Sequence, residues 1–259
     1  MSPGRRNPET LIEDACAIAR SAAATIMAIH ERGAKMRTKS DRSPVTDADE
    51  AANALIVARL EALTPEIPVI AEESVAHGYV PPIEGGDFWL VDPLDGTKEF
   101  LSESNEFTVN IALIEDRRPV LGVVQLPALD QLYFGAVGLG ASARIGEAPA
   151  RAIGVRAQPA DGATVVASRS HFSAATEEWL SDVAVTSIRH AGSSLKFCVI
   201  AAGEADLYPR LGRTMEWDTA AGHAVLAAAG GQVRDLDGTE LLYGKPGFEN
   251  PHFVARGGS

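Results

Sequence analysis

The stretch Trp89-Leu-Val-Asp92-Pro-Leu-Asp95-Gly-Thr97 leads from an apolar segment directly into two aspartates. Residues 88–91 are apolar throughout, which is typical of a buried strand. Pro93 forces a tight exit from that strand, so the two carboxylates, and the carbonyl oxygen of Leu94, can converge on one point. Hard divalent cations bind oxygen ligands of this kind, and Mg²⁺ is usually held by a few carboxylates together with substrate phosphate. A β-turn with solvated aspartates is the alternative, because Asp-Gly is common in turns.

Two more acidic residues, Glu72 and Glu73, follow the segment Pro68-Val-Ile-Ala71, which also predicts a short buried strand. Neighbouring parallel strands end at the same edge of a sheet, and ligands bind at that edge. The glutamates can therefore lie beside the two aspartates. A solvated strand end is the alternative.

Asp49 and Asp218 are the remaining acidic candidates. Asp49 lies beside Asp47 near the start of a predicted helix, where acidic residues usually complement the helix dipole. Asp218 precedes a run of small residues at another predicted helix start, where an aspartate is usually a cap. Each residue alone favours these structural roles. The four acidic segments together are hard to obtain by chance, and they predict a metal-dependent site.

Apolar periodicity predicts helices and strands along most of the chain. Helices are expected over residues 9–32, 43–63, 174–183, 193–202 and 216–229. Strands are expected over residues 68–71, 88–91, 107–114, 119–126, 131–136, 164–167, 185–189 and 205–208, and near Phe253. This order fits a stacked α/β/α/β arrangement. Gly138-Leu-Gly140 and residues 145–162 suggest the joint between an N-terminal half, 1–158, and a C-terminal half, 159–259.

The net charge is −12 over 259 residues, so the chain has no surplus of Lys and Arg to displace counterions from a nucleic-acid polymer. Cys16 and Cys198 lie in apolar helical patterns and are expected to be reduced core residues, as in a cytoplasmic protein. The sequence contains no recognisable signal peptide or membrane span, so integral membrane association is not expected. Monomer and homodimer both remain open.

Four ordered motifs resemble the inositol monophosphatase superfamily. They span about 180 residues and are Ser43-Pro-Val-Thr-Asp-Ala-Asp49, Ile70-Ala-Glu72-Glu73-Ser, Asp92-Pro-Leu-Asp-Gly-Thr97 and Trp217-Asp218-Thr-Ala-Ala-Gly222. Four further segments are similar to the CysQ-type 3'(2'),5'-bisphosphate nucleotidases within it: Thr97-Lys-Glu-Phe100, Glu106-Phe-Thr-Val-Asn-Ile-Ala-Leu-Ile114, Gly192-Ser-Ser-Leu-Lys-Phe197 and Tyr208-Pro-Arg210. The resemblance implies an α/β fold, an αβαβα sandwich of the inositol monophosphatase and fructose-1,6-bisphosphatase type.

The resemblance also implies a role for each matching residue. Two or three Mg²⁺ ions would be bound by Glu72, Asp92, Asp95, Asp218 and the carbonyl oxygen of Leu94. Glu73, the neighbour of Glu72, is implied as a contact to a third, weaker ion. Asp49, and not Asp47, would act with Thr97 to orient and activate the attacking water. The backbone amides of Gly96 and Thr97 would hold the transferred phosphate.

Basic residues favour a substrate with a second phosphate. Simple sugar-alcohol phosphatases of this superfamily have Asp-Gly-Thr-Thr-Asn-Phe where this chain has Asp-Gly-Thr-Lys-Glu-Phe, and they tend to have an acidic residue in place of Arg210. A guanidinium there, with the ammonium of Lys196, suits a second phosphate, which Arg can bind bidentately. A surface ion pair for Arg210 and a snorkelling surface lysine are the alternatives. The other expected substrate contacts are Lys98, Ser168, His171, Gly192, Ser193 and Ser194.

Together these features predict a Mg²⁺-dependent phosphatase that removes the 3'-phosphate of 3'-phosphoadenosine 5'-phosphate to give AMP, in sulfur assimilation or nucleotide recycling. A broader phosphatase acting on inositol phosphate, fructose bisphosphate or NADP is the alternative within the enzyme class. A catalytically silent nucleotide-binding member of the fold is the alternative outside it. The complete acidic set speaks against a silent member, because binding alone would not need every metal ligand.

Overall fold

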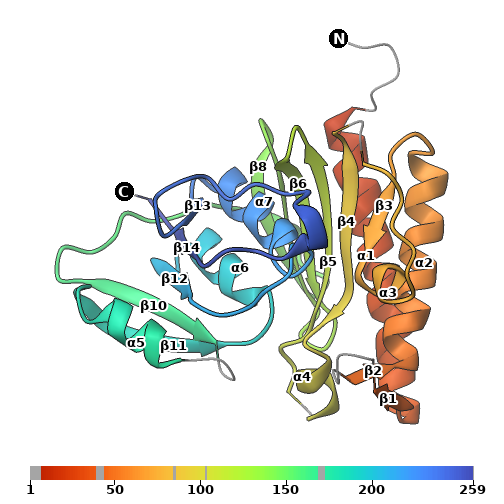
Figure 1. Ribbon diagram of the computed structural model, residues 1–259, viewed down its shortest axis with the longest axis horizontal. Helices are drawn as coiled ribbons and strands as arrows, with labels where there is room; N and C mark the ends of the chain where they lie inside the picture. Colours follow the sequence, from red (N-terminus) through yellow and green to blue (C-terminus); the bar gives the residue numbers. More distant parts are fainter. Residues whose placement is uncertain (1–6, 39–43, 84–85, 103, 169–172, 259) are drawn as a thin grey trace.

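The computed structural model describes residues 7–38, 44–83, 86–102, 104–168 and 173–258 (Figure 1). Its helices and strands in chain order are α1 (Pro8–Arg32), β1 (Met36–Thr38), β2 (Pro44–Thr46), α2 (Asp47–Leu63), β3 (Val69–Ala71), α3 (Glu72–Ala76), β4 (Phe88–Asp95), α4 (Thr97–Leu101), β5 (Thr108–Glu115), β6 (Arg118–Leu126), β7 (Gln131–Ala136), β8 (Gly140–Ile145), β9 (Arg151–Ile153), β10 (Ala163–Ser168), α5 (Ala174–Leu180), β11 (Val185–Ala191), α6 (Leu195–Ala201), β12 (Leu207–Arg210), α7 (Ala220–Ala228), β13 (Gln232–Asp235), the 3₁₀ turn η1 (Pro246–Phe248) and β14 (Phe253–Arg256).

The larger sheet has the strand order β3-β4-β5-β6-β7-β8-β9. Strands β3 and β4 are parallel, and the other neighbours are antiparallel. Alternate side chains of β4 enter different cores: Trp89 and Val91 pack with α1 and α2, whereas Phe88 and Leu90 pack with α6 and α7. Both faces of β4 are therefore covered by helices, which explains its uninterrupted apolar sequence.

The smaller sheet has the strand order β11-β10-β12-β14-β13. One face of this sheet packs against α6 and α7. The opposite face packs against α5 through a cluster that includes Val165, Leu180 and Leu207. Figure 1 shows the resulting layers: α1 and α2, the larger sheet, α6 and α7, the smaller sheet, and α5. The expected αβαβα sandwich is confirmed.

Gly122 explains how closely α7 approaches the larger sheet. A Cβ atom at this position of β6 would clash with the carbonyl oxygen of Ala221 in the first turn of α7. The missing side chain therefore lets the helix backbone rest directly on the strand. This contact places Asp218, just before the helix, close to the end of β4.

Two expected helix starts were wrong near the site. The helix expected from Ser43 and Pro44 begins at Asp47, because residues 44–46 pair with β1 instead and the Thr46 hydroxyl accepts a hydrogen bond from the amide of Ala48 as the helix cap. The helix expected from residue 216 begins at Ala220. Strand β12 and helices α5 and α6 have ends that differ from the expected ranges by a few residues.

Strands β8 and β9 were not predicted, and they lie partly inside the stretch expected to join the two halves. Their sequences, Gly-Ala-Ser-Ala-Arg-Ile and Arg-Ala-Ile, contain few β-branched residues and many exposed positions. They extend the larger sheet at its outer edge. The expected division of the chain after residue 158 falls between β9 and β10 and stays a prediction.

Cys16 in α1 and Cys198 in α6 are buried and free, as expected. In the part of the chain that the structure describes, no helix combines the length and the apolar character that crossing a bilayer requires.

Candidate active site

A bulge at the end of β4 brings its two aspartates to the same place. Asp92 pairs with Asn110 of β5 and Asp95 with Thr108, so three steps along β4 oppose two steps along β5. Pro93, which has no N–H to donate to the ladder, lies in this irregular stretch. The amide of Leu94 donates to Asp92 Oδ1 at 3.0 Å, which fixes the carboxylate against the bulge.

A third carboxylate, Asp49, reaches the end of β4 from helix α2. It occupies the third helical position, where its Oδ2 accepts hydrogen bonds from the Thr46 amide at 2.7 Å and the Thr46 hydroxyl at 2.6 Å. Its Oδ1 accepts a hydrogen bond from the Thr97 hydroxyl at 3.0 Å. Burial raises the pKa of Asp49, and the hydrogen bonds from Thr46 and Thr97 oppose that rise.

Asp47 is used elsewhere. Its Oδ1 accepts a hydrogen bond from the Lys35 amide at 2.9 Å, and its Oδ2 lies 3.6 Å from the guanidinium of Arg32. The neighbouring aspartates therefore point to different partners, and only Asp49 contacts Thr97.

The acidic side chains at the end of β4 disfavour one another's ionisation. Burial raises the pKa of Asp92 well above its ordinary value, and the charges of Glu72, Asp95 and Asp218 raise it further. Asp218 behaves in the same way, through burial and the charges of Asp95 and Glu72. Burial raises the pKa of Asp95 to about 6, although the ammonium of Lys196 opposes the rise.

This donor set fits a hard divalent cation. Four neighbouring carboxylates repel one another, and a cation among them would remove that cost. Among the described residues, no group of three or more His, Cys, Asp or Glu side chains already converges closely enough to hold a metal ion. In this arrangement Asp218 Oδ2 accepts a hydrogen bond from the Met215 amide at 2.8 Å. The ligand chemistry is present, and the final convergence of the carboxylates would accompany binding of the ion.

The turn at residues 192–196 connects the end of β4 to the segment before α7. The hydroxyl of Ser193 donates to the Asp95 carbonyl at 3.0 Å, and the hydroxyl of Ser194 donates to the Asp218 carbonyl at 2.7 Å. The amide of Gly192 donates to Glu106 Oε2 at 2.8 Å. These bonds hold β4 and the segment before α7 in a fixed relation, although they are distant in sequence.

The backbone at position 96 can accommodate only glycine. Its φ of 88° lies in the left-handed region, and a Cβ atom would clash with Ser193 Oγ. This conformation turns the chain directly from β4 into α4, where Thr97 is the first residue. The amides of Gly96 and Thr97 therefore lie at the edge of the acidic cluster.

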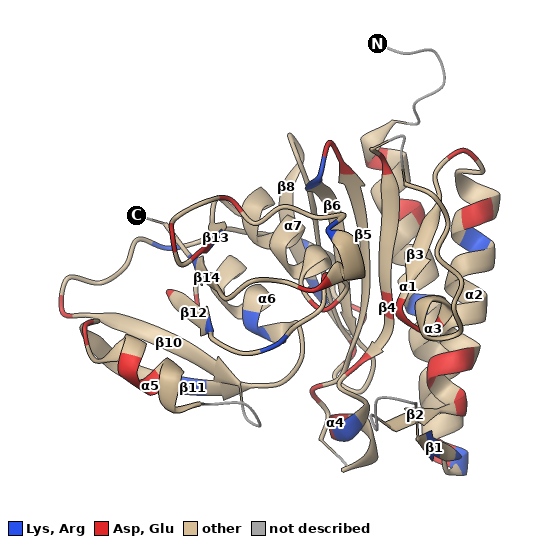
Figure 2. Ribbon diagram, viewed as in Figure 1, with Lys and Arg blue, Asp and Glu red and all other residues tan. Residues whose placement is uncertain are grey.

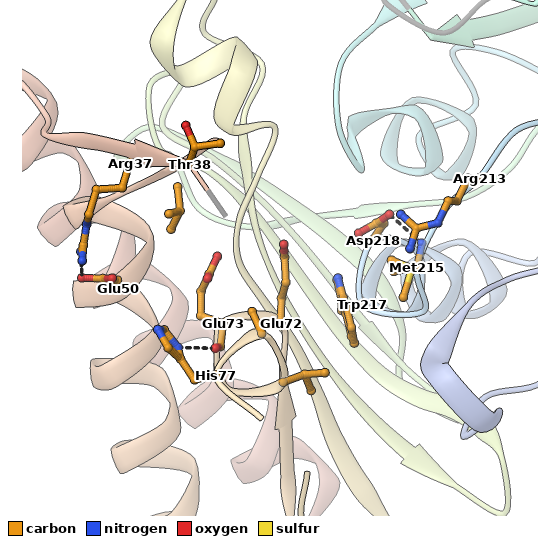
Figure 3. Close-up of a pocket in the computed structure, with 13 residues that line it drawn as sticks. Arg37, Thr38, Glu50, Glu72, Glu73, His77, Arg213, Met215, Trp217 and Asp218 are labelled. Atoms are coloured by element: carbon orange, nitrogen blue, oxygen red, sulfur yellow. Dashed lines mark hydrogen bonds and ion pairs between the residues drawn. The ribbon is translucent and has the colours of Figure 1, made fainter. Parts of the chain in front are cut away.

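Two cavities meet at this cluster. The smaller, of about 280 Å³, is lined by ten of the residues expected in the site: Glu72, Asp95, Gly96, Thr97, Lys98, Ser168, Ser193, Lys196, Arg210 and Asp218. The larger, of about 630 Å³, lies between β1, α3 and residues 213–218 (Figure 3). Three residues line both cavities: Glu72, Arg213 and Asp218.

Basic groups face the smaller cavity beside the acidic ones. Figure 2 shows basic positions on α4 and α6 and near β12, and acidic positions at the end of β4. Lys196 is buried, and its Nζ donates to the Ser193 carbonyl at 2.5 Å and lies 5.3 Å from the ring centre of Tyr208. Burial lowers the pKa of Lys196 to about 8, although the Asp95 charge opposes this change. The expected snorkelling alternative does not describe such a buried ammonium.

Arg210 lies at the end of β12, and its Nη2 donates to the backbone carbonyl of Arg213 at 2.8 Å. Its Nε is buried without a hydrogen-bond partner among the described residues. No ion pair of Arg210 is found in the described part of the chain, so the expected surface-pair alternative has no counterpart there.

Some expected residues lie behind the cavities or outside the described chain. Asp49, Asp92, Leu94, Gly192 and Ser194 line neither cavity and reach the site through the hydrogen bonds given above. Glu73 lines the larger cavity. His171 lies outside the described residues. Buried His223 bonds through Nδ1 to the Tyr243 hydroxyl at 3.0 Å, consistent with the packing role typical of such a histidine.

Arg213 and Trp217 were not predicted as site residues, but both line the larger cavity. Trp217 belongs to a motif in which only Asp218 was given a role. Arg213 stands three positions after Arg210 in Arg-Leu-Gly-Arg, and the close repeat of arginine was the one signal in the sequence.

Comparison with known sequences gives a consistent result. Residues 7–255 match the inositol monophosphatase family. The chain is 45% identical over 251 residues to the protein named 3'(2'),5'-bisphosphate nucleotidase CysQ of Escherichia coli O157:H7, covering 94% of this chain and 98% of that protein. The protein of the same name from Salmonella typhimurium is 45% identical over 250 residues, with the same coverage.

Solved structures agree. CysQ from Bacteroides thetaiotaomicron, described as a bacterial member of the inositol monophosphatase family, superposes with a TM-score of 0.79 at 36% identity, covering 96% of this chain and 98% of that one. An inositol monophosphatase from Zymomonas mobilis superposes with a TM-score of 0.79 at 27% identity, covering 98% and 95%. The resemblance seen in the motifs is confirmed, and the chain belongs to the inositol monophosphatase family.

Proposed function

We propose that the chain is a Mg²⁺-dependent phosphatase that removes the 3'-phosphate of 3'-phosphoadenosine 5'-phosphate, yielding AMP and inorganic phosphate. One observation carries the choice of substrate: Lys196 and Arg210 line the same cavity as Asp95, Gly96 and Thr97. A bisphosphate can then reach the acidic centre with one phosphate and the basic groups with the other. The relatives named 3'(2'),5'-bisphosphate nucleotidase support the same substrate class.

The metal ions would be held by the side chains of Glu72, Asp92, Asp95 and Asp218 and by the carbonyl oxygen of Leu94. Bound there, Mg²⁺ supplies charge neutralisation at the phosphoryl oxygens and lowers the pKa of water. Phosphoryl transfer depends mainly on positioning and electrostatics, so the chain needs no nucleophilic side chain. Burial raises the pKa of both thiols, to about 12 for Cys16, which agrees with a mechanism that uses neither cysteine.

Asp49 and Thr97 would handle the proton of the attacking water. The hydroxyl hydrogen of Thr97 is committed to Asp49 Oδ1, so the lone pairs of Thr97 Oγ1 are left to accept a hydrogen bond from water. As the water attacks, its proton can pass to Thr97 Oγ1 while the threonine proton moves to Asp49. Burial raises the pKa of Asp49, which makes this carboxylate a stronger base.

The backbone at the start of α4 would hold the transferred phosphate. Gly96 and Thr97 present N–H groups that have no carbonyl partner within the helix, and such groups bind anions. Gly96 is required in this place because its conformation and its contact with Ser193 exclude a side chain.

Lys196 and Arg210 would bind the phosphate that is not removed. Arg210 has a buried Nε without a partner among the described residues, and a phosphate oxygen would supply one. Lys196 supplies a single positive charge. Burial lowers its pKa, and the negative charge of a bound phosphate would raise the pKa again and keep the amine protonated. This substrate would place the chain in sulfur assimilation or nucleotide recycling, and we infer a cytoplasmic location.

The test is hydrolysis of 3'-phosphoadenosine 5'-phosphate with Mg²⁺ and with EDTA, followed by chromatographic identification of the nucleotide product. The proposal predicts Mg²⁺-dependent release of phosphate and the appearance of adenosine 5'-phosphate. Formation of adenosine 3'-phosphate would show that the wrong phosphate had been assigned to the acidic centre. Absence of release from this substrate and from other phosphate esters would support the silent binding member of the fold.

A further inference from the structure

Arg213 occupies the junction between the two cavities. It lines both of them, together with Glu72 and Asp218. Figure 3 shows Arg213 and Asp218 among the residues that line the larger cavity. Arg213 is thus a fourth cation at the smaller cavity, after Lys98, Lys196 and Arg210, and neither the motifs nor the family resemblance assigned it a role.

The backbone of Arg213 is held firmly. Its carbonyl oxygen accepts the 2.8 Å hydrogen bond from Arg210 Nη2, and two residues later the Met215 amide donates to Asp218. The backbone of Arg213 is therefore fixed in position between Arg210 and the acidic cluster.

Its side chain is held only weakly. Arg213 Nε lies 3.3 Å from Glu249 Oε2, and the two side chains are 66% and 56% exposed. An ion pair between such exposed groups contributes little and is screened by salt. The guanidinium can therefore exchange Glu249 for a stronger anionic partner at small cost.

We infer that Arg213 binds the phosphate of the substrate that is not removed, leaving Glu249 when a bisphosphate enters. This inference rests on the proposed function, because it needs a substrate with two phosphates. Arg210 and Arg213 then act from the same rim, and a dianionic phosphate can accept bidentate hydrogen bonds from a guanidinium. Glu249 competes with the substrate for Arg213, so its removal strengthens binding of the bisphosphate.

The experiment compares Arg213→Gln and Glu249→Gln on 3'-phosphoadenosine 5'-phosphate and on adenosine 3'-phosphate, at saturating Mg²⁺. The two substrates share the nucleoside and differ only in the 5'-phosphate. Arg213→Gln should raise KM for the bisphosphate roughly tenfold or more, the loss expected for one charged hydrogen bond, with little change in kcat. Its effect on KM for the monophosphate should be several times smaller. Glu249→Gln should lower KM for the bisphosphate.

The opposite changes in KM for the bisphosphate in the two variants distinguish this role from that of a structural ion pair. If the pair only stabilises the fold, both variants lower the unfolding temperature alike and leave KM for the bisphosphate unchanged, and the inference is overturned. Equal effects of Arg213→Gln on the two substrates would also overturn it, as would a rise in KM in Glu249→Gln. Failure of the proposed function would appear already in the unmodified protein, as equal kcat/KM for the bisphosphate and the monophosphate.

Discussion

The hydroxyl of Thr97 donates a hydrogen bond to Asp49 Oδ1 at 3.0 Å, joining two residues that are 48 positions apart. The pair links the first turn of α2 to the first residue of α4. Asp49 cannot turn away, because both of its carboxylate oxygens are engaged, one by Thr97 and the other by Thr46. The geometry thus pre-organises a base and a hydroxyl at the edge of the acidic cluster.

Replacing Asp49 with Asn should lower kcat by roughly 100-fold or more, because the amide cannot accept the proton that passes through Thr97. KM should change little, because Asp49 lines neither cavity. Steady-state kinetics on the bisphosphate measure both values. Asp47→Asn is the matched control and should leave kcat within about twofold, because Asp47 bonds to the Lys35 amide and not to Thr97. Comparable losses in the two variants would contradict the assignment.

Gly96→Ala should reduce kcat/KM by about 100-fold, because it displaces the amides that would hold the phosphate. The substitution combines a positive φ with a clash against Ser193 Oγ. Gly33→Ala is its control: φ is 84° there, but no atom lies within 4 Å of the added Cβ. Both variants should lose about 1 kcal/mol or more of unfolding free energy from the backbone conformation alone. If Gly33→Ala lost activity as strongly as Gly96→Ala, the local account would be wrong.

Metal binding and protonation should compete at Asp95. Its pKa is raised to about 6, so between roughly pH 4 and 6 the metal-free folded protein holds a proton that the unfolded chain releases. Stability of the metal-free protein should therefore fall as pH rises through this window. Mg²⁺ needs the ionised carboxylate, so the unfolding temperature in Mg²⁺ minus that in EDTA should widen from pH 5 to pH 7. A difference independent of pH would contradict the acidic cluster as the metal site.

Lys196 should limit activity on the bisphosphate at high pH. Burial lowers its pKa to about 8, and above that pH the free enzyme loses the ammonium. Because kcat/KM reports ionisations of the free enzyme, its value for 3'-phosphoadenosine 5'-phosphate should decline as pH rises through about 8. Adenosine 3'-phosphate, which lacks the second phosphate, should not show this decline. Identical alkaline limbs for the two substrates would remove the role given to Lys196.

The sequence predicted best what depends on neighbouring residues. Pro93 and Gly96 act within their own segment, so the tight exit from β4 could be inferred directly. Apolar periodicity predicted a stacked α/β/α/β arrangement, because burial on one face or both leaves a period in the sequence, and the family resemblance supplied the complete αβαβα sandwich. Strands β8 and β9 escaped prediction because edge strands with small and exposed residues carry a weak signal.

The closeness of Glu72 to the aspartates of β4 followed from the rule that parallel strands end at the same edge of a sheet. Other long-range contacts were accessible only through family resemblance or not at all. Nothing in the residues around Asp49 indicates that Thr97 would meet it, and the motif alone assigned that pair. Arg213 was missed because the repeat of arginine at positions 210 and 213 does not reveal that the Arg210 side chain bonds to the Arg213 backbone.

The central claim is that this acidic centre serves a bisphosphate substrate. The most direct measurement is kcat/KM for 3'-phosphoadenosine 5'-phosphate and for inositol 1-phosphate, at the same Mg²⁺ concentration and pH. The account predicts a preference for the nucleotide of at least about tenfold, the contribution of one charged hydrogen bond from Lys196 or Arg210. Equal values, or a preference for inositol 1-phosphate, would contradict it and would favour a broader sugar phosphatase.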